Sequence, residues 1–194
     1  IPAMIVSACM NTNPLMIYFG QELGERGMDT EGFSGRDGRT TIFDYWSVDT
    51  VRRWRNGGKF DDKFLNDDEK ELRSFYSRLL NLCNSEKAIR EGVFFDLTYA
   101  NLAGWTFNEH KQYAFMRKCD DELLLVVVNF DSMPARAGVN IPQHAFDFLG
   151  IPPKTDYEAT ELLTGNTEKL SLMPEKTTPV LLDAMSGKVL KFKL

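Results

Sequence analysis

Side chains that could do chemistry gather in one glycine-rich polar stretch, 20–45, and just beyond it. They carry amide, carboxylate, guanidinium and indole groups: Gln21, Glu22, Arg36, Asp37, Arg39 and Trp46. Amides and carboxylates form directed hydrogen bonds, and a planar guanidinium can hold a hydroxyl or carboxylate through two donors. Long loops inside compact domains are usually functional or disordered, so this stretch is the first candidate for a ligand site.

Each group also has a structural alternative. Gln21 and Glu22 could brace neighbouring loops, because buried polar groups are usually satisfied locally. The Arg36, Asp37 and Arg39 cluster could be an internal salt-bridge network. Trp46, like Trp54, could be core or interface packing. Glu22 and Glu25 do not suggest an acid and base pair, because their spacing in a loop fixes no separation between the carboxylates.

Other reactive residue types form no recognisable site. Cys9, Cys83 and Cys119 are widely spaced, and we expect buried free thiols. His110 and His144 are expected to be solvated. An acidic run contains Asp61, Asp62, Asp67 and Asp68. It lacks the spacing of a calcium loop and is typical of a turn and a helix start. The chain thus predicts no metal and no cofactor of its own.

Composition excludes several classes of partner. Hydrophobic residues make up 43% and charged residues 26%, which indicates a globular chain. A net charge of -5 without a basic stripe argues against nucleic acid. No run approaches the roughly 20 apolar residues of a membrane helix. The chain begins at Ile1-Pro2 without a signal-peptide pattern, which favours a removed leader or a piece of a longer chain. The compartment is left open.

The first half predicts helices around one apolar strand. A buried helix is expected over Ala3–Met10, and a strand covered on both faces over Leu15–Phe19, as in a parallel sheet flanked by helices. Ser47 would cap a short helix through Arg55. The clearest helix runs from Asp67 to Asn84, with Asn66 and Glu69 as a capping box.

The second half predicts short antiparallel strands. The expected strands are Val93–Leu97, Tyr113–Cys119, Leu123–Phe130, Tyr157–Leu163, Val180–Leu182 and Val189–Leu194. Asp120-Asp121 would turn a central hairpin, and a short helix is expected over Pro142–Leu149, closed by Gly150. This half is typical of an antiparallel β-sandwich.

The first half cannot be a complete domain on this interpretation. One apolar parallel strand needs neighbours on both edges, and the sequence offers no other. We therefore expect residues 1–87 to be the C-terminal remnant of an α/β domain, and residues 88–194 to be the antiparallel sandwich.

The residues then suggest a family. Asn13–Glu22, NPLMIYFGQE, resembles the last barrel strand of the α-amylase family (glycoside hydrolase family 13), commonly G-x-P-x-x-Y-Y-G-x-E, with Phe19 in place of the second Tyr. Arg39–Trp46 resembles the segment R-x-P-M-x-W, although Thr41 replaces the proline. The helix 67–84 and the hairpin 113–130 resemble the last barrel helix and the central hairpin of the C-terminal domain. The resemblance covers nearly the whole chain in order.

This resemblance implies the end of a (β/α)₈ barrel followed by a β-sandwich. The intact parent would hydrolyse or transfer α-linked glucose with retention, through two carboxylates ~5 Å apart. The family's catalytic carboxylates lie on earlier strands, and this chain has no Asn-His-Asp motif. They are therefore expected upstream of Ile1, and this chain by itself should be inactive.

The resemblance also implies ligands. The parent would bind an α-glucan or oligosaccharide, and calcium in the parent is a further implication of the family. Barrel sites lie at the C-terminal ends of strands, so the loop after Phe19 would face the substrate. In this setting the six residues named first are weak candidates for sugar contacts.

Two alternatives remain open. The sandwich could be a non-catalytic carbohydrate-binding or interaction module, with Tyr99, Trp105, Phe107 and Tyr113 as candidate platforms. The chain could instead come from a catalytically dead relative that serves as a scaffold. We also expect the isolated chain to self-associate, to rearrange or to lean on its sandwich, because the strand 15–19 would expose unpaired edges and apolar faces.

Overall fold

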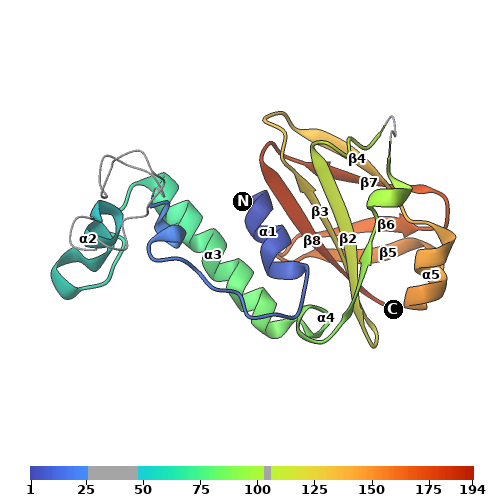
Figure 1. The fold of residues 1–194 in the computed structure, drawn as a ribbon, viewed down its shortest axis with the longest axis horizontal. Helices are drawn as coiled ribbons and strands as arrows, with labels where there is room; N and C mark the ends of the chain where they lie inside the picture. The colour runs from blue at the N-terminus through green and yellow to red at the C-terminus, as the bar shows by residue number, and fades with distance from the viewer. Residues whose placement is uncertain (26–47, 103–105) are drawn as a thin grey trace. The chain divides into compact units, whose positions relative to one another are not determined.

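The computed structural model describes residues 1–25, 48–102 and 106–194 (Figure 1). The chain divides into two compact units. One unit, called here the sheet unit, comprises Ile1–Pro14 and Leu79–Leu194, and the other, the helical unit, comprises Leu15–Arg78. The predicted boundary between residues 87 and 88 concerns the domains of a larger parent, so it stays a prediction.

The sheet unit contains a six-stranded antiparallel sheet and a two-stranded one. The large sheet has the order β1 (Val93–Asp96), β2 (Gln112–Cys119), β3 (Glu122–Asn129), β8 (Ser186–Lys193), β5 (Lys154–Glu161) and β6 (Thr167–Leu172). The small sheet pairs β4 (Ala135–Asn140) with β7 (Thr177–Leu182). All six predicted strands are present, within a few residues of their expected ends. The antiparallel sandwich is therefore confirmed.

Two strands were not predicted from the sequence. β4 reads ARAGVN and β6 reads TEKLSL, so each contains residues that are poor in strands and few large apolar ones. These two strands form because each has a neighbouring strand with which it makes backbone hydrogen bonds. β4 pairs along its whole length with β7, and β6 pairs with β5. Pairing thus overrides a weak local preference.

Strand β3 is buried on both faces. Leu123, Leu125 and Val127 belong to the core between the two sheets. The alternate residues of β3 are equally buried on the opposite face, where helix α1 (Pro2–Cys9) contacts β3 and β8 (Figure 1). This double cover explains a strand with no polar alternation in an antiparallel sheet. The predicted hairpin turn is also confirmed, with Asp120 in the left-handed region at φ 51°.

Helix α4 (Lys87–Arg90) joins the sheet through a buried guanidinium. Arg117 on β2 is 2% exposed, and it donates to the carbonyl oxygens of Ala88 (3.1 Å), Ile89 (2.8 Å) and Met10 (2.9 Å). The last of these carbonyls is at the C-cap of α1. One side chain therefore fastens α1 and α4 to the same strand.

The remaining helices agree largely with expectation. α1 is the predicted buried helix, and α5 (Gln143–Leu149) ends at Gly150 in the left-handed conformation. η4 (Thr98–Ala100) follows β1. In the helical unit, α2 (Asp49–Arg55) continues into η3 (Asn56–Gly58), and its N-cap is Val48 without a side-chain hydrogen bond. Ser47, the predicted cap, lies outside the described residues.

Helix α3 (Asp67–Ser85) begins with the predicted capping box. The Glu69 amide donates to Asn66 Oδ1 at 2.8 Å, and the Asn66 amide donates to Glu69 Oε2 at 3.0 Å. Arg53 of α2 pairs with the same Glu69 carboxylate. The start of α3 is thus fixed by three polar contacts within the helical unit.

The predicted strand Leu15–Phe19 is wrong for this chain. These residues form no strand, and Met16 is 86% exposed and Phe19 42% exposed. A strand needs a hydrogen-bonded neighbour, and no described residue of the helical unit offers one. The apolar pattern alone therefore did not decide the conformation.

Candidate functional site

The loop after Phe19 is a tight turn held between two glycines. η1 (Gln21–Leu23) is bounded by Gly20 and Gly24, which adopt φ 80° and 75°. A Cβ on Gly20 would also lie 2.8 Å from Glu25 Cβ. Positive φ is rarely open to other residues, so this glycine spacing fixes how the loop presents Gln21 and Glu22.

Gln21 braces the loop. Its Nε2 donates to the Tyr76 hydroxyl of α3 at 2.9 Å, and its Oε1 accepts from the Tyr18 amide at 3.1 Å. Both ends of the side-chain amide are therefore engaged within the helical unit. This geometry favours the structural alternative over a free sugar contact, which remains a prediction.

The two glutamates of this loop have different surroundings. Glu25 accepts a hydrogen bond of 2.5 Å from Thr50 Oγ1 of α2, which fastens the loop to that helix. Glu22 is partly exposed at the turn. Of the side chains that the structure describes in this loop, Glu22 has the most freedom to meet a ligand. Within residues 20–25, the described part of the loop, no acid is poised opposite a base.

Four predicted site residues cannot be placed. Arg36, Asp37, Arg39 and Trp46 lie outside the described residues, so their role as sugar contacts stays a prediction. Trp54, in contrast, is described and packs locally. Its ring meets Phe60 edge-on with centroids 5.3 Å apart, and the Arg73 guanidinium lies 5.2 Å from its centroid.

The acidic run at 61–68 does not fit a calcium ion. Asp61 accepts from Asn56 Nδ2 at 2.8 Å and from the Lys63 amide at 3.2 Å, and these hydrogen bonds lower the pKa of its carboxyl group. Asp67 lies 3.6 Å from Lys70 Nζ in the first turn of α3. Within residues 1–25, 48–102 and 106–194, no three or more His, Cys, Asp or Glu side chains converge as a metal site. The calcium implied for the parent is therefore not assigned to these residues.

The three predicted aromatic platform residues that the structure describes do not form a single row. Phe107 is buried, Trp105 lies outside the described residues, and Tyr113 packs beside Phe115 with centroids 5.6 Å apart. Burial, together with the charge and hydrogen bond of Asp96, raises the pKa of Tyr113 to about 12. Tyr99 alone of the described candidates is more than half exposed.

Tyr99 belongs to a different aromatic group that the sequence analysis missed. Phe95 of β1 contacts Tyr99, His144 and Phe148, with centroids 5.5–6.3 Å apart. Phe148 is 57% exposed on α5. Its place at i+4 from His144 on a short helix was the available signal.

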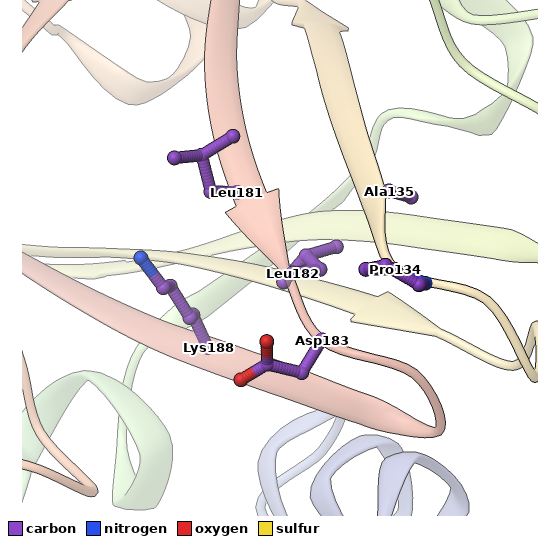
Figure 2. A pocket seen from close by; sticks show the side chains of 6 residues that line it. All are labelled: Pro134, Ala135, Leu181, Leu182, Asp183 and Lys188. Carbon is purple, nitrogen blue, oxygen red and sulfur yellow. The ribbon is translucent and has the colours of Figure 1, made fainter.

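A pocket of about 400 Å³ lies between the start of β4, the end of β7 and the start of β8 (Figure 2). Its lining residues are Pro134, Ala135, Leu181, Leu182, Asp183 and Lys188. Figure 2 shows the Lys188 and Asp183 side chains extending in different directions. Lys188 Nζ instead pairs with Glu168 at 3.0 Å. None of the predicted site residues lines this pocket, and it offers no acid and base pair.

Comparisons with solved structures identify the fold. AmyP, solved in complex with maltose, matches 98% of this chain with 18% identity and a TM-score of 0.60. The α-amylase from Geobacillus thermoleovorans, solved with acarbose, matches 99% with 16% identity and a TM-score of 0.59. The maltogenic α-amylase AmyB from Thermotoga neapolitana matches 99% with 11% identity and a TM-score of 0.59.

The match is to one part of each amylase. This chain spans 33%, 32% and 36% of those three structures, about a third of their length. No protein-family model and no curated protein matches the sequence. No helix in the described part of the chain is long and apolar enough to span a bilayer.

The likeness to the three solved structures shows that the chain has the fold of the C-terminal part of an α-amylase. This part consists of the end of the barrel domain, without a closed barrel, followed by an antiparallel sandwich.

Proposed function

We propose that this chain is the C-terminal part of an α-amylase-like glycoside hydrolase, and that the intact parent acts on α-glucans with retention. One observation carries the proposal. The fold likeness covers 98–99% of this chain and about a third of each amylase. The motif NPLMIYFGQE, at the expected place before the sandwich, supports it independently.

The chain by itself is proposed to be catalytically inactive. Retaining glycoside hydrolysis needs a nucleophile and an acid whose carboxyl groups are about 5–5.5 Å apart across the scissile bond. In the loop that would face the substrate, the Glu25 carboxylate already accepts a hydrogen bond from the Thr50 hydroxyl. We place the catalytic carboxylates of the parent in the barrel strands that would precede Ile1.

The loop 20–25 would then support the substrate site of the parent. Gln21 holds the loop against α3, and Glu25 holds it against α2. Glu22 is left at the surface of this braced turn. A sugar contact by Glu22 would therefore be a property of the assembled parent, in which an oligosaccharide lies against the rim.

An activity assay tests the proposal. The 194-residue chain is incubated with starch and with a chromogenic maltoside, and then with the same substrates after the upstream residues of the parent are joined to it. We expect turnover only from the joined protein, with the anomeric configuration retained. Turnover by the purified 194-residue chain would overturn the assignment, as would a joined protein that inverts the product.

A binding assay addresses the non-catalytic alternative. If the sandwich were a carbohydrate-binding module, the chain would be retained on immobilised starch and released by soluble oligosaccharide. We expect it in the flow-through. Retention that Tyr99→Ala and Phe148→Ala abolish would favour the binding module instead.

Self-association of the isolated chain is part of the same proposal. The segment 15–19 exposes Met16 and Phe19 in this chain, and exposed apolar side chains promote association. We expect sedimentation velocity to show a concentration-dependent dimer that Met16→Lys weakens. A monomer at every concentration would contradict this expectation.

A further inference from the structure

Two cysteines that are far apart in the sequence meet in the sheet unit. Cys9 is the last residue of α1, and Cys83 lies in the last turn of α3. Cys83 Sγ donates at 3.5 Å to the carbonyl oxygen of Ala8, the residue before Cys9, which brings the two thiols together. Both are free thiols. The sequence predicted buried free thiols and gave no sign that two of them meet, so this juxtaposition is a product of the fold.

The two thiols have unequal surroundings. Cys9 is completely buried, whereas Cys83 is partly exposed. The hydrogen bond with Cys83 and burial raise the pKa of Cys9. The hydrogen bond from Cys9 lowers the pKa of Cys83. Cys9 therefore keeps its proton to a higher pH than Cys83 does, and Cys83 more readily forms the thiolate that nucleophilic attack requires.

A fixed positive charge lies on the same side of the sheet. The Arg117 guanidinium opposes the rise in the pKa of Cys9, and it donates to the carbonyl of the next residue, Met10. When Cys9 loses its proton, this charge stabilises the resulting thiolate. Cys119 has a different setting, at the end of β2 beside Lys87 and Asp120.

We propose that Cys9 and Cys83 form a redox-active dithiol, which a small-molecule disulfide oxidises to an intramolecular disulfide between α1 and α3. The Cys83 thiolate attacks one sulfur of the reagent, whose S–S bond breaks and releases one thiolate that takes up a proton. Cys9 then gives up its proton and attacks Cys83 Sγ, which expels the second thiol. The protein loses two electrons and two protons, and the reagent becomes two thiols.

The disulfide would lock the helix that covers the sheet. α1 covers one face of β3 and β8, and it precedes the exposed segment 15–19. A cross-link to residue 83 closes a long loop, which restricts the unfolded chain and stabilises the folded one. The proposal does not depend on the assignment to an α-glucan hydrolase.

Thiol mapping of the native 194-residue chain tests the proposal. The chain is equilibrated with oxidised glutathione, remaining thiols are alkylated, and peptides are identified by mass spectrometry. We expect two of the three thiols to be protected, a linked peptide pair containing Cys9 and Cys83, and Cys119 alkylated. Reduction with a dithiol should restore all three thiols and lower the thermal midpoint of unfolding.

Matched variants separate the steps. Cys119→Ser should form the same link as the unsubstituted chain. Cys9→Ser should stop at a mixed disulfide between Cys83 and glutathione, because the resolving thiol is missing. If Cys9→Ser fails to fold, the thiol maps of the unsubstituted chain and of Cys119→Ser still show whether Cys9 and Cys83 become linked. Three alkylated thiols in the folded, oxidant-treated chain, or a link that includes Cys119, would overturn the proposal.

Discussion

Replacement of Arg117 by Met tests how the sheet unit is held together. Arg117 donates to three backbone carbonyls, two in α4 and one at the end of α1. Met keeps an unbranched apolar side chain but removes every donor. Three carbonyl oxygens near the sheet would then lose a partner in one step, and the ends of two helices would no longer be tied to β2.

The expected loss follows from those three contacts. The Ala88 carbonyl keeps the Gly92 amide as a donor at 3.1 Å, so only the Ile89 and Met10 carbonyls would be left without a replacement for this partner. A buried acceptor left without a partner costs about 1–3 kcal/mol, so two could cost roughly 2–6 kcal/mol. Two terms reduce this figure. Removal of a buried cation relieves its desolvation, and water can reach the partly exposed Met10. We therefore expect a loss in the lower half of this range, about 3 kcal/mol of unfolding free energy.

Urea unfolding followed by tryptophan fluorescence and circular dichroism measures this change. For a chain of this size, a loss of about 3 kcal/mol corresponds to a fall of roughly 6–12 °C in the thermal midpoint. Arg117→Lys should recover only part of the loss, because one ammonium nitrogen cannot reach three carbonyls on two elements. Lys169→Met, at an exposed position of β6, serves as the control and should change stability by less than about 0.5 kcal/mol.

One result would refute this reasoning. If Arg117→Met unfolded at the same urea concentration as the unsubstituted chain, with an unchanged slope, the guanidinium would contribute no net stability. The desolvation cost of the buried charge would then equal the value of its hydrogen bonds.

Three further predictions rest on local geometry. Gly92→Ala should destabilise the chain by about 3 kcal/mol, because the added Cβ would lie 2.2 Å from the Ala88 carbonyl oxygen; urea unfolding measures it. Asn66→Ala should cost about 1 kcal/mol, because it removes the side-chain cap of α3; the same unfolding curves measure it. Tyr113 should ionise at about pH 12. Because its folded pKa is raised, its stabilising effect is complete below about pH 10, the unfolded value, and is lost as the pH rises through the folded value; a tyrosinate absorbance titration follows this.

Each of these predictions has its own control. Gly165→Ala, at a positive φ but in open space, should cost only about 1–2 kcal/mol, and an equal loss at both glycines would contradict the contact argument. For the cap, Glu71→Ala on the exposed face of α3 should be nearly neutral, and an identical loss there would remove the case for Asn66. Tyr113→Phe should abolish the tyrosinate absorbance change near pH 12. If that change persisted, another of the six tyrosines would cause it.

The predictable elements were those whose signals are local. The capping box at Asn66 and Glu69, the stop at Gly150 and the turn at Asp120 depend on neighbours in sequence, and the structure contains all three. Strands β4 and β6 carry weak local signals and arise from pairing with distant partners. For the candidate site, the sequence located the loop at Gln21 and Glu22, but only the structure shows that Gln21 is bound to Tyr76.

Two apolar runs with the same sequence pattern have different conformations, which tertiary structure determines. Leu15–Phe19 and Leu123–Val128 are both apolar without alternation, which by itself indicates only burial on both faces. The second run is a buried antiparallel strand because α1 and the small sheet cover it; the first is no strand, because no neighbour pairs with it. The sequence by itself determined helices α1, α2, α3 and α5, the hairpin turn and the family likeness, through local pattern and motif order. Contacts between distant residues, which no local pattern encodes, decided the pairing of strands, the Arg117 clamp and the meeting of Cys9 with Cys83.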